Sequence, residues 1–262
     1  MNARAGARRR GILRKLLFLI PFVLIPSSAF AWGPLTHVYL GSEIFYLSSL
    51  LPGAVYGLIN KFRQDYLYGN MMADMILAKQ YLPYHKHPHS WEVAAGIMEA
   101  ADTEAERAFS LGYMSHLAAD TVAHGRLTRG ARNLRHTFLE LSADRLVASG
   151  YWSRAVAIDR KVQLRGDAFL ERSLESFIFS FNTNKRIFKG LVFLSGLNKD
   201  GFGNLAALET IRSRRLETLK GLHAESLDRI VDVLSKGEDS EVLKKDPIGK
   251  IRGGKVLKAF LS

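Results

Sequence analysis

Three potential metal ligands are spaced four residues apart in the segment HLAADTVAH, residues 116–124. They are His116, Asp120 and His124. Residues four apart in an α-helix lie one turn apart on the same face. At a rise of 1.5 Å per residue, His116 and His124 are about 12 Å apart along the axis, too far to bind one ion easily. If the segment binds metal, Asp120 therefore lies between two ions, whose remaining ligands come from other segments.

Other ligand candidates cluster in the same half of the chain. Seven of the eight histidines lie between His37 and His136, and His223 is the exception. His136 and Glu140 repeat the i, i+4 spacing, which suits two ligands that reach one ion from successive helical turns. Asp74 lies in a segment rich in methionine and alanine, where an unpaired buried carboxylate would be costly. A single helical histidine is more often hydrogen-bonded than metal-bound, but this clustering predicts a metal site. His223 has no nearby ligand in the sequence, and we leave it out of the site.

The elements that must position these residues are helical by their hydrophobic periodicity. The pattern predicts helices over residues 38–51, 54–63, 65–78, 91–101, 104–124, 131–149, 154–180, 185–196 and 204–236. Thr103 to Glu106 reads as a capping box that opens the helix carrying His116. No strand pattern of comparable length appears. We expect one all-α domain with a C-terminal helical extension and a loosely held tail from about residue 237.

The first 31 residues have the layout of a secretory signal peptide. A basic start is followed by the apolar run LLFLIPFVLIP, residues 16–26, and then by Ala29-Phe30-Ala31, a small-x-small cleavage signal. The run is shorter than the roughly 20 residues that span a bilayer, and Pro21 interrupts it, so an uncleaved membrane anchor is the weaker alternative. We expect cleavage after Ala31 and export to the periplasm or the medium. Arg9-Arg10 leaves a twin-arginine route open.

Charge and cysteine content limit the partners only broadly. Removing residues 1–31 takes away six basic and no acidic groups, so the net charge falls from +12 to +6. This modest excess favours anionic surfaces such as lipid headgroups or nucleic acid, without selecting between them. The chain has no cysteine, which excludes disulfides and thiolate ligands.

Five segments in order resemble the bacterial zinc-dependent phospholipase C family. They are Trp-Gly-x-x-Thr-His from Trp32, Gly-Asn-x-x-x-Asp ending at Asp74, His-Ser-Trp from His89, His-x-x-x-Asp-x-x-x-His from His116, and His-x-x-x-Glu from His136. The resemblance covers about residues 32–145. It implies an all-α catalytic domain, here residues 32–150, around a cluster of three zinc ions. Residues 151–262 would then form a helical region packed on that domain.

The same resemblance implies a ligand for each zinc. Trp32, as the mature N-terminus, would bind the first zinc through its amine and carbonyl oxygen, together with His37. Asp120 would bridge to a second zinc, and His124, His136 and Glu140 would hold the third. Asp74, His89 and His116 would complete the second. Within HKHPHSW we select His89, with His87 as the second choice, while His85 and the unselected residue either support the ligand or lie exposed.

The implied activity is phosphodiester hydrolysis by zinc-bound hydroxide, with Asp74 and Asp120 as the catalytic carboxylates. The expected substrate is a glycerophospholipid at a membrane surface, cleaved to diacylglycerol and a phosphorylated headgroup. The spacing from Asp120 to His124 is shorter than in the best-known secreted phospholipases C, which weakens the transfer of substrate detail. The alternatives are a zinc-dependent nuclease, in which nucleic acid is the partner, and a non-enzymatic metal- or membrane-binding protein. We infer no obligate protein partner.

Two groups of side chains have both a functional and a plainer interpretation. Aromatic residues could border a lipid-accepting cleft, but core packing is the more frequent role of such side chains; they are Tyr39, Phe45, Tyr46, Tyr81, Tyr84 and Trp91. Basic residues late in the chain could face an anionic membrane, but a solvated helix surface is favoured; they include Arg212, Arg214, Arg215 and Lys220.

Overall fold

The all-α prediction is confirmed for the part of the chain that the structure describes. The computed structural model describes residues 32–76, 82–123, 151, 157–174, 180–186, 188–189 and 209–248, and no strand occurs among them. The α-helices are α2 (Pro34–Glu43), α3 (Gly53–Lys61), α4 (Arg63–Met72), α5 (Trp91–Glu99), α6 (Glu104–Val122), α9 (Arg160–Ser173) and α11 (Glu209–Lys236). None of the helices in these ranges is long and apolar enough to cross a bilayer.

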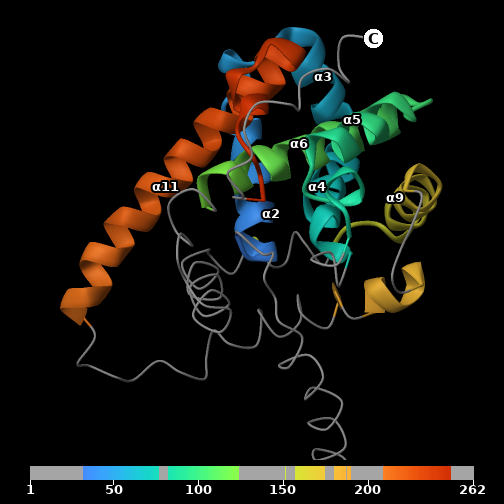
Figure 1. Ribbon diagram of the computed structural model, residues 1–262. Helices are drawn as coiled ribbons and strands as arrows, with labels where there is room; N and C mark the ends of the chain where they lie inside the picture. The colour runs from blue at the N-terminus through green and yellow to red at the C-terminus, as the bar shows by residue number, and fades with distance from the viewer. Residues whose placement is uncertain are drawn as a thin grey trace, which may run out of the picture.

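Helix α6 lies at the centre of the bundle. It crosses α2 and α4, while the long α11 runs along one side and α9 lies on the opposite side (Figure 1). The predicted capping box is present at its start: the Thr103 hydroxyl accepts from Glu106 N at 3.2 Å, and the Glu106 carboxylate accepts from Thr103 N at 3.1 Å. Fourteen of its residues are buried, so α6 forms the core of the fold as well as part of the site.

Two glycines let α4 and α6 cross with their backbones in contact. A Cβ atom at Gly69 would lie 2.0 Å from the Phe109 carbonyl oxygen, and one at Gly112 would lie 2.0 Å from the Tyr66 carbonyl oxygen. Both contacts are far shorter than real side-chain carbons make, so any larger residue would force the helices apart. The close crossing brings the end of α4 next to the middle of α6.

Several helix boundaries differ from the sequence prediction; the helix expected over residues 154–180, for example, is α9 over Arg160–Ser173. The first helix ends at Glu43 and continues as 3-10 turns, η1 (Ile44–Tyr46) and η2 (Ser48–Leu50). Leu51 is extended because the following residue, Pro52, disfavours the helical conformation before it. Helix α4 ends at Met72, and the 3-10 turn η3 (Ala73–Met75) carries Asp74.

The aromatic candidates separate into core and surface residues. Phe45 and Trp91 belong to the buried core, as core packing predicts, and the Trp91 indole donates to the Lys245 carbonyl oxygen at 2.8 Å. Tyr46, in contrast, is 70% exposed. Tyr81 lies outside the described residues. Among the basic residues, Lys220 is exposed and pairs with Glu217 at 3.0 Å, which fits a solvated helix surface.

The C-terminal segment is packed at least as far as Ile248, so the expectation of a loose tail from about residue 237 is wrong for this stretch. It forms η8 (Gly237–Asp239) and η9 (Glu241–Lys244). Val242 and Leu243 are buried in the core. The high charge of the sequence hid this short apolar pair, which is enough to hold the segment against the body.

Candidate metal centre

His37 enters the site from the first turn of α2. Gly33 caps this helix, Pro34 occupies its first position, and His37 N donates to the Gly33 carbonyl oxygen at 3.2 Å. Proline suits the first position of a helix because the N–H groups there have no acceptor within the helix, so the N–H that proline lacks costs no hydrogen bond. The segment therefore fixes where the helix begins, and with it the direction of the His37 ring, which is 1% exposed.

His116 and Asp120 come from successive turns of α6 and are fully buried. His116 Nδ1 lies 2.8 Å from the Asn70 carbonyl oxygen, which can only accept, so Nδ1 carries the proton. The neutral ring then presents the lone pair of Nε2 to the site. Such a contact to a backbone carbonyl is the usual way in which a metal-binding histidine is oriented. Asn70 lies on α4, so the glycine-mediated crossing also sets the tautomer of His116.

The histidine-rich segment delivers His89 and leaves His85 exposed. The Tyr113 hydroxyl donates to the Pro88 carbonyl oxygen at 2.6 Å, which ties the segment to α6. Burial, with the charge of Asp74, raises the pKa of Tyr113 well above its ordinary value, so the phenol remains a donor. His87 is also buried, and its Nδ1 accepts from His89 N at 3.1 Å. His87 thus supports the backbone of His89.

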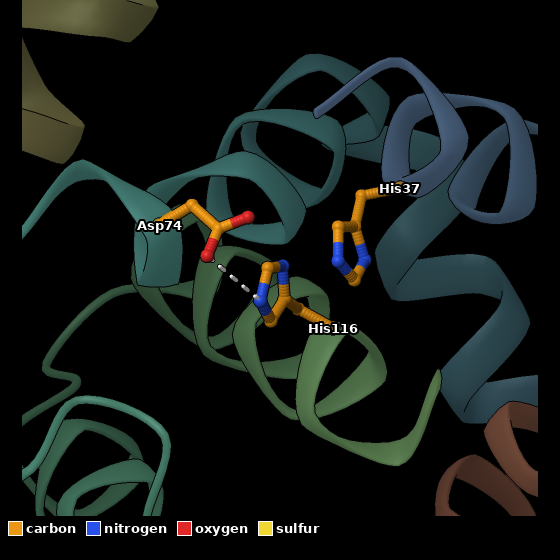
Figure 2. Close-up of side chains that lie close together, drawn as sticks. All are labelled: His37, Asp74 and His116. Atoms are coloured by element: carbon orange, nitrogen blue, oxygen red, sulfur yellow. Dashed lines mark ion pairs between the residues drawn. The ribbon is translucent and has the colours of Figure 1, made fainter. Parts of the chain in front are cut away.

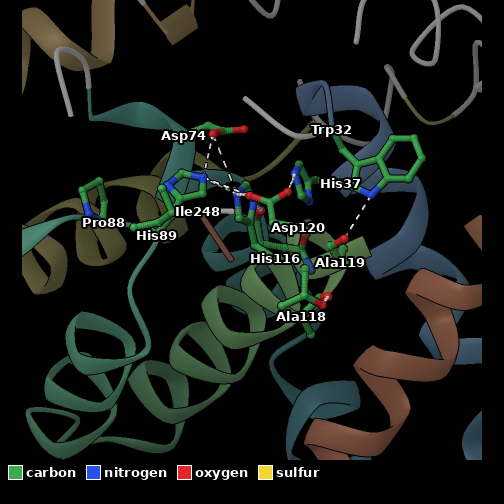
Figure 3. Close-up of polar contacts among 12 residues, drawn as sticks. Trp32, His37, Asp74, Pro88, His89, His116, Ala118, Ala119, Asp120 and Ile248 are labelled. Carbon is green, nitrogen blue, oxygen red and sulfur yellow. Dashed lines mark hydrogen bonds and ion pairs between the residues drawn. The ribbon is translucent and has the colours of Figure 1, made fainter. Parts of the chain in front are cut away.

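The side chains of five predicted ligands meet in the interior. The His116 ring lies between Asp74 and His37 (Figure 2), and its plane stacks on that of His37 with centroids 3.5 Å apart. His89 completes the group from the other side of Asp74 (Figure 3). Asp120 faces two ways: Oδ1 is 3.2 Å from His37 Nε2, while Oδ2 is 3.1 Å from His89 Nε2 and 3.2 Å from His116 Nε2.

Three of these donor atoms, on His89, His116 and Asp120, lie at the spacing of ligands to one zinc ion, and Asp74 lies beside both histidines. His89 Nε2 lies 3.0 Å from His116 Nε2, 3.1 Å from Asp74 Oδ1 and 3.1 Å from Asp120 Oδ2. His116 Nε2 lies 3.8 Å from Asp74 Oδ1 and 3.2 Å from Asp120 Oδ2. Zinc bonds of 2.0–2.1 Å in tetrahedral geometry place ligand atoms about 3.3 Å apart. The donors of His89, His116 and Asp120 therefore suit one zinc ion, with Asp74 Oδ1 beside the two histidines.

A second group of donors overlaps the first. The ligand atoms of His37, Asp74 and His116 lie within 4.8 Å of one another, as do those of His89, His116 and Asp120. His37 Nδ1 is buried without a hydrogen-bond partner among the described residues. Because Asp120 Oδ1 faces His37 and Oδ2 faces the other two histidines, the arrangement suits two neighbouring cations that share one carboxylate.

The electrostatics of the cluster keep Asp120 ionised and His37 neutral. Burial opposes the ionisation of Asp120, but His116 and His37 outweigh it and hold its pKa well below its ordinary value. Burial lowers the pKa of His37, and the neighbouring His116 lowers it further against the opposing effect of Asp120. An ionised carboxylate and a neutral imidazole are the forms that bind a metal.

The remaining predicted ligands are placed only in part. Trp32 is fully buried, and its indole Nε1 donates to the Ala119 carbonyl oxygen at 3.2 Å (Figure 3), next to Asp120 in the chain. His124, His136 and Glu140, the predicted ligands of a third ion, lie outside the described residues.

His223 is the residue near the site that sequence reasoning left out. Its ring, on α11, lies 4.9 Å from that of Trp32 and 5.3 Å from that of Tyr39. No ligand spacing surrounds it in the sequence. The hydrophobic pattern of the helix could have indicated that His223 is buried. His223 lies beside the buried face of α11, which is formed by Leu219, Leu222, Ser226 and Ile230.

The burial of His223 predicts a pH dependence of stability. Burial lowers its pKa from 6.5 to about 4, so the unfolded chain binds the proton more readily. Stability is then fully present above pH 6.5 and falls as the pH drops toward 4. Between pH 7 and 5, the metal-stripped protein should lose about 2 kcal/mol of unfolding free energy through this group. Urea denaturation of the wild type and of His223→Phe measures the difference, and equal pH dependence in the two would contradict it.

Alanine substitutions in the histidine-rich segment should rank its three histidines by their contribution to zinc affinity. His89→Ala removes one of the three mutually close donors and should abolish zinc binding at that position. His87→Ala leaves His89 N without its acceptor and should weaken zinc binding about 10-fold. His85→Ala, at an exposed position, should leave zinc affinity unchanged. Competition with a chromophoric chelator measures all three, and a greater loss from His87→Ala than from His89→Ala would reverse the assignment.

Comparison with known proteins adds one finding. The family model described as zinc dependent phospholipase C matches residues 36–184, more than half of the chain. The chain matches no curated protein and no solved structure.

Proposed function

The chain belongs to the zinc-dependent phospholipase C family, and from this premise we propose that it is an exported hydrolase that cleaves glycerophospholipids to diacylglycerol and a phosphorylated headgroup. The observation that carries the proposal is the buried donor cluster of Asp74, His89, His116 and Asp120. Export rests on the layout of residues 1–31, which lie outside the described residues.

We assign the donors to three cations. Trp32 and His37 would hold the first, with Asp120 as the bridge to a second held by Asp74, His89 and His116. The two-sided contacts of Asp120 support this bridge. His124, His136 and Glu140 would hold the third. The protein's affinity for zinc is a property of its family, while the number of ions and their ligands are our proposal.

Bound zinc would supply Lewis acidity, which polarises phosphoryl oxygens and lowers the pKa of an attacking water. Asp120, with its depressed pKa, stays ionised and serves as a ligand rather than as a base. We therefore assign Asp74 as the base that takes the proton from the attacking water. The water oxygen forms the new bond to phosphorus, the bond to the diacylglycerol oxygen breaks, and that oxygen takes up the proton held by Asp74 to leave as an alcohol.

The buried surroundings of the cluster suit this chemistry. Asp74, His89, His116 and Asp120 are each at most 1% exposed in the described structure. Charges in such an environment interact more strongly than in water and are already oriented before the reaction. His116 is held by the Asn70 carbonyl oxygen, and His89 by the segment anchored through Pro88.

A comparison of two phosphodiesters tests the proposal. Zinc-loaded protein is incubated with phosphatidylcholine vesicles and, separately, with single-stranded DNA, and diacylglycerol and nucleotide release are measured. We expect diacylglycerol formation that a chelator abolishes and added zinc restores, with little DNA cleavage. Faster cleavage of DNA would indicate the nuclease alternative. A full zinc complement without turnover of either substrate would indicate a non-enzymatic binding protein.

A further inference from the structure

Helix α11 contacts the site although it lies outside the part of the chain that the family model covers. The match ends at residue 184, and α11 spans Glu209–Lys236. Trp32 lies outside the match as well, because the match begins at residue 36. The two outlying segments meet in the structure: the His223 ring approaches the Trp32 indole edge-on, with centroids 4.9 Å apart and planes at 61°.

The Trp32 indole is held by contacts to two helices. From α6, the Ala119 carbonyl oxygen accepts from Nε1 at 3.2 Å. From α11, His223 packs against the ring and also contacts Tyr39 of α2 at 5.3 Å between centroids. The indole is fully buried as a result. The contacts made by the side chain thus fix the place of Trp32 beside Asp120.

A second contact joins α11 to the same part of α6. Arg229 donates from one guanidinium nitrogen to the Thr121 hydroxyl at 2.7 Å and from the other to Glu225 at 2.5 Å. Thr121 follows Asp120 directly and donates to the Ala118 carbonyl oxygen at 2.6 Å. Helix α11 therefore contacts the turn that carries Asp120 as well as Trp32.

We propose that α11 is a working part of the metal centre, in which His223 is a positioning residue that holds Trp32 so that its main-chain donors reach the cation beside His37. This inference rests on the proposed function, in which Trp32 is a metal ligand. Metal bonds tolerate displacements of only about 0.2 Å, so a ligand carried at the end of the chain needs an external support. His223 and the Ala119 carbonyl oxygen supply it from opposite elements.

The test separates support of the metal from support of the fold. His223→Ala is compared with Leu234→Ala, a buried residue of the same helix about 16 Å further along its axis. The chain is isolated from an exporting host, its N-terminus is determined by mass, and it is stripped with a chelator. Zinc affinity and the zinc-dependent increase in Tm are then measured for each variant.

We expect Leu234→Ala to lower Tm equally with and without zinc and to keep the wild-type affinity. His223→Ala should bind zinc about 10- to 100-fold more weakly and lose part of the zinc-dependent increase. His223→Phe, which retains a ring against Trp32, should restore most of it. If His223→Ala does not fold, His223→Leu, which fills the space without a ring, takes its place.

The outcomes distinguish a failure of the positioning role of His223 from a failure of the proposed function. A wild-type zinc affinity in His223→Ala, or in His223→Leu as its replacement, would overturn the positioning role and leave the proposed function intact. A wild-type chain that neither binds zinc nor gains stability from it would overturn both. A uniform loss of Tm in the His223 variants, with the zinc increment preserved, would reduce His223 to an ordinary core residue.

Discussion

Asp120→Asn is expected to lose bound zinc and phosphodiester hydrolysis together, with activity falling by about 10³-fold. The substitution keeps the shape of the side chain but replaces an oxygen by an amide group that donates. Asp120 contacts His37 through Oδ1 and both His89 and His116 through Oδ2, so either orientation of the amide removes a ligand atom. Elemental analysis of zinc per chain and diacylglycerol release from phosphatidylcholine vesicles measure the two losses.

Asp65→Asn is the matched control for Asp120→Asn. Asp65 is also a buried carboxylate, but it lies at the start of α4, where it accepts from Arg165 Nε of α9 at 2.5 Å. The change should lower the unfolding free energy by about 1–3 kcal/mol through the weakened pair, without loss of zinc. A fully active Asp120→Asn, or an inactive but stable Asp65→Asn, would count against the bridging role of Asp120.

Gly69→Ala should destabilise the protein by about 3 kcal/mol or more and disrupt the metal centre from a distance. The new Cβ would lie 2.0 Å from the Phe109 carbonyl oxygen, a backbone atom that cannot turn aside. Helices α4 and α6 would have to separate, and His116 Nδ1 would lose its contact with the Asn70 carbonyl oxygen. Thermal unfolding and zinc affinity should therefore fall together in this variant.

Gly96→Ala is the control for this prediction. It is a helical glycine of α5, and apart from its chain neighbours and its own helix backbone, no atom lies within 4 Å of the position of a Cβ. Alanine should stabilise the helix there by about 0.5–1 kcal/mol because it restricts the unfolded chain and favours the helix. Equal effects of the two substitutions on Tm would show that the close crossing tolerates a methyl group and that our account of Gly69 is wrong.

Local signals in the sequence were enough to predict the helical fold and much of the cluster. Periodicity, the capping box at Thr103 and the i, i+4 spacing of His116 and Asp120 depend only on neighbouring residues, and the structure contains each of them. The 3-10 turn at Asp74 was not predictable, because it depends on how α4 ends against α6. The packed segment around Val242 was missed because its high charge hid the short apolar pair, Val242 and Leu243, that packs into the core.

Long-range contacts determine the features of the site that could not be predicted from the sequence. The choice among three histidines within five residues depends on Tyr113, which is 25 residues from the Pro88 carbonyl oxygen it binds. The place of His223 depends on Trp32, far away in the chain, and no local spacing encodes that pairing. The third group of predicted ligands, His124, His136 and Glu140, lies outside the described residues and remains a prediction.

The packing of α11 and of the segment after it has a consequence for the order of synthesis. The Trp91 indole binds Lys245, 154 residues later, and the Ser235 hydroxyl binds Leu50 across 185 residues. Contacts between such distant parts close large loops and form late in folding. A nascent chain that has emerged only through Asp120 therefore carries histidines and carboxylates that α11 does not yet cover, so synthesis must reach about Lys245 before these contacts can form.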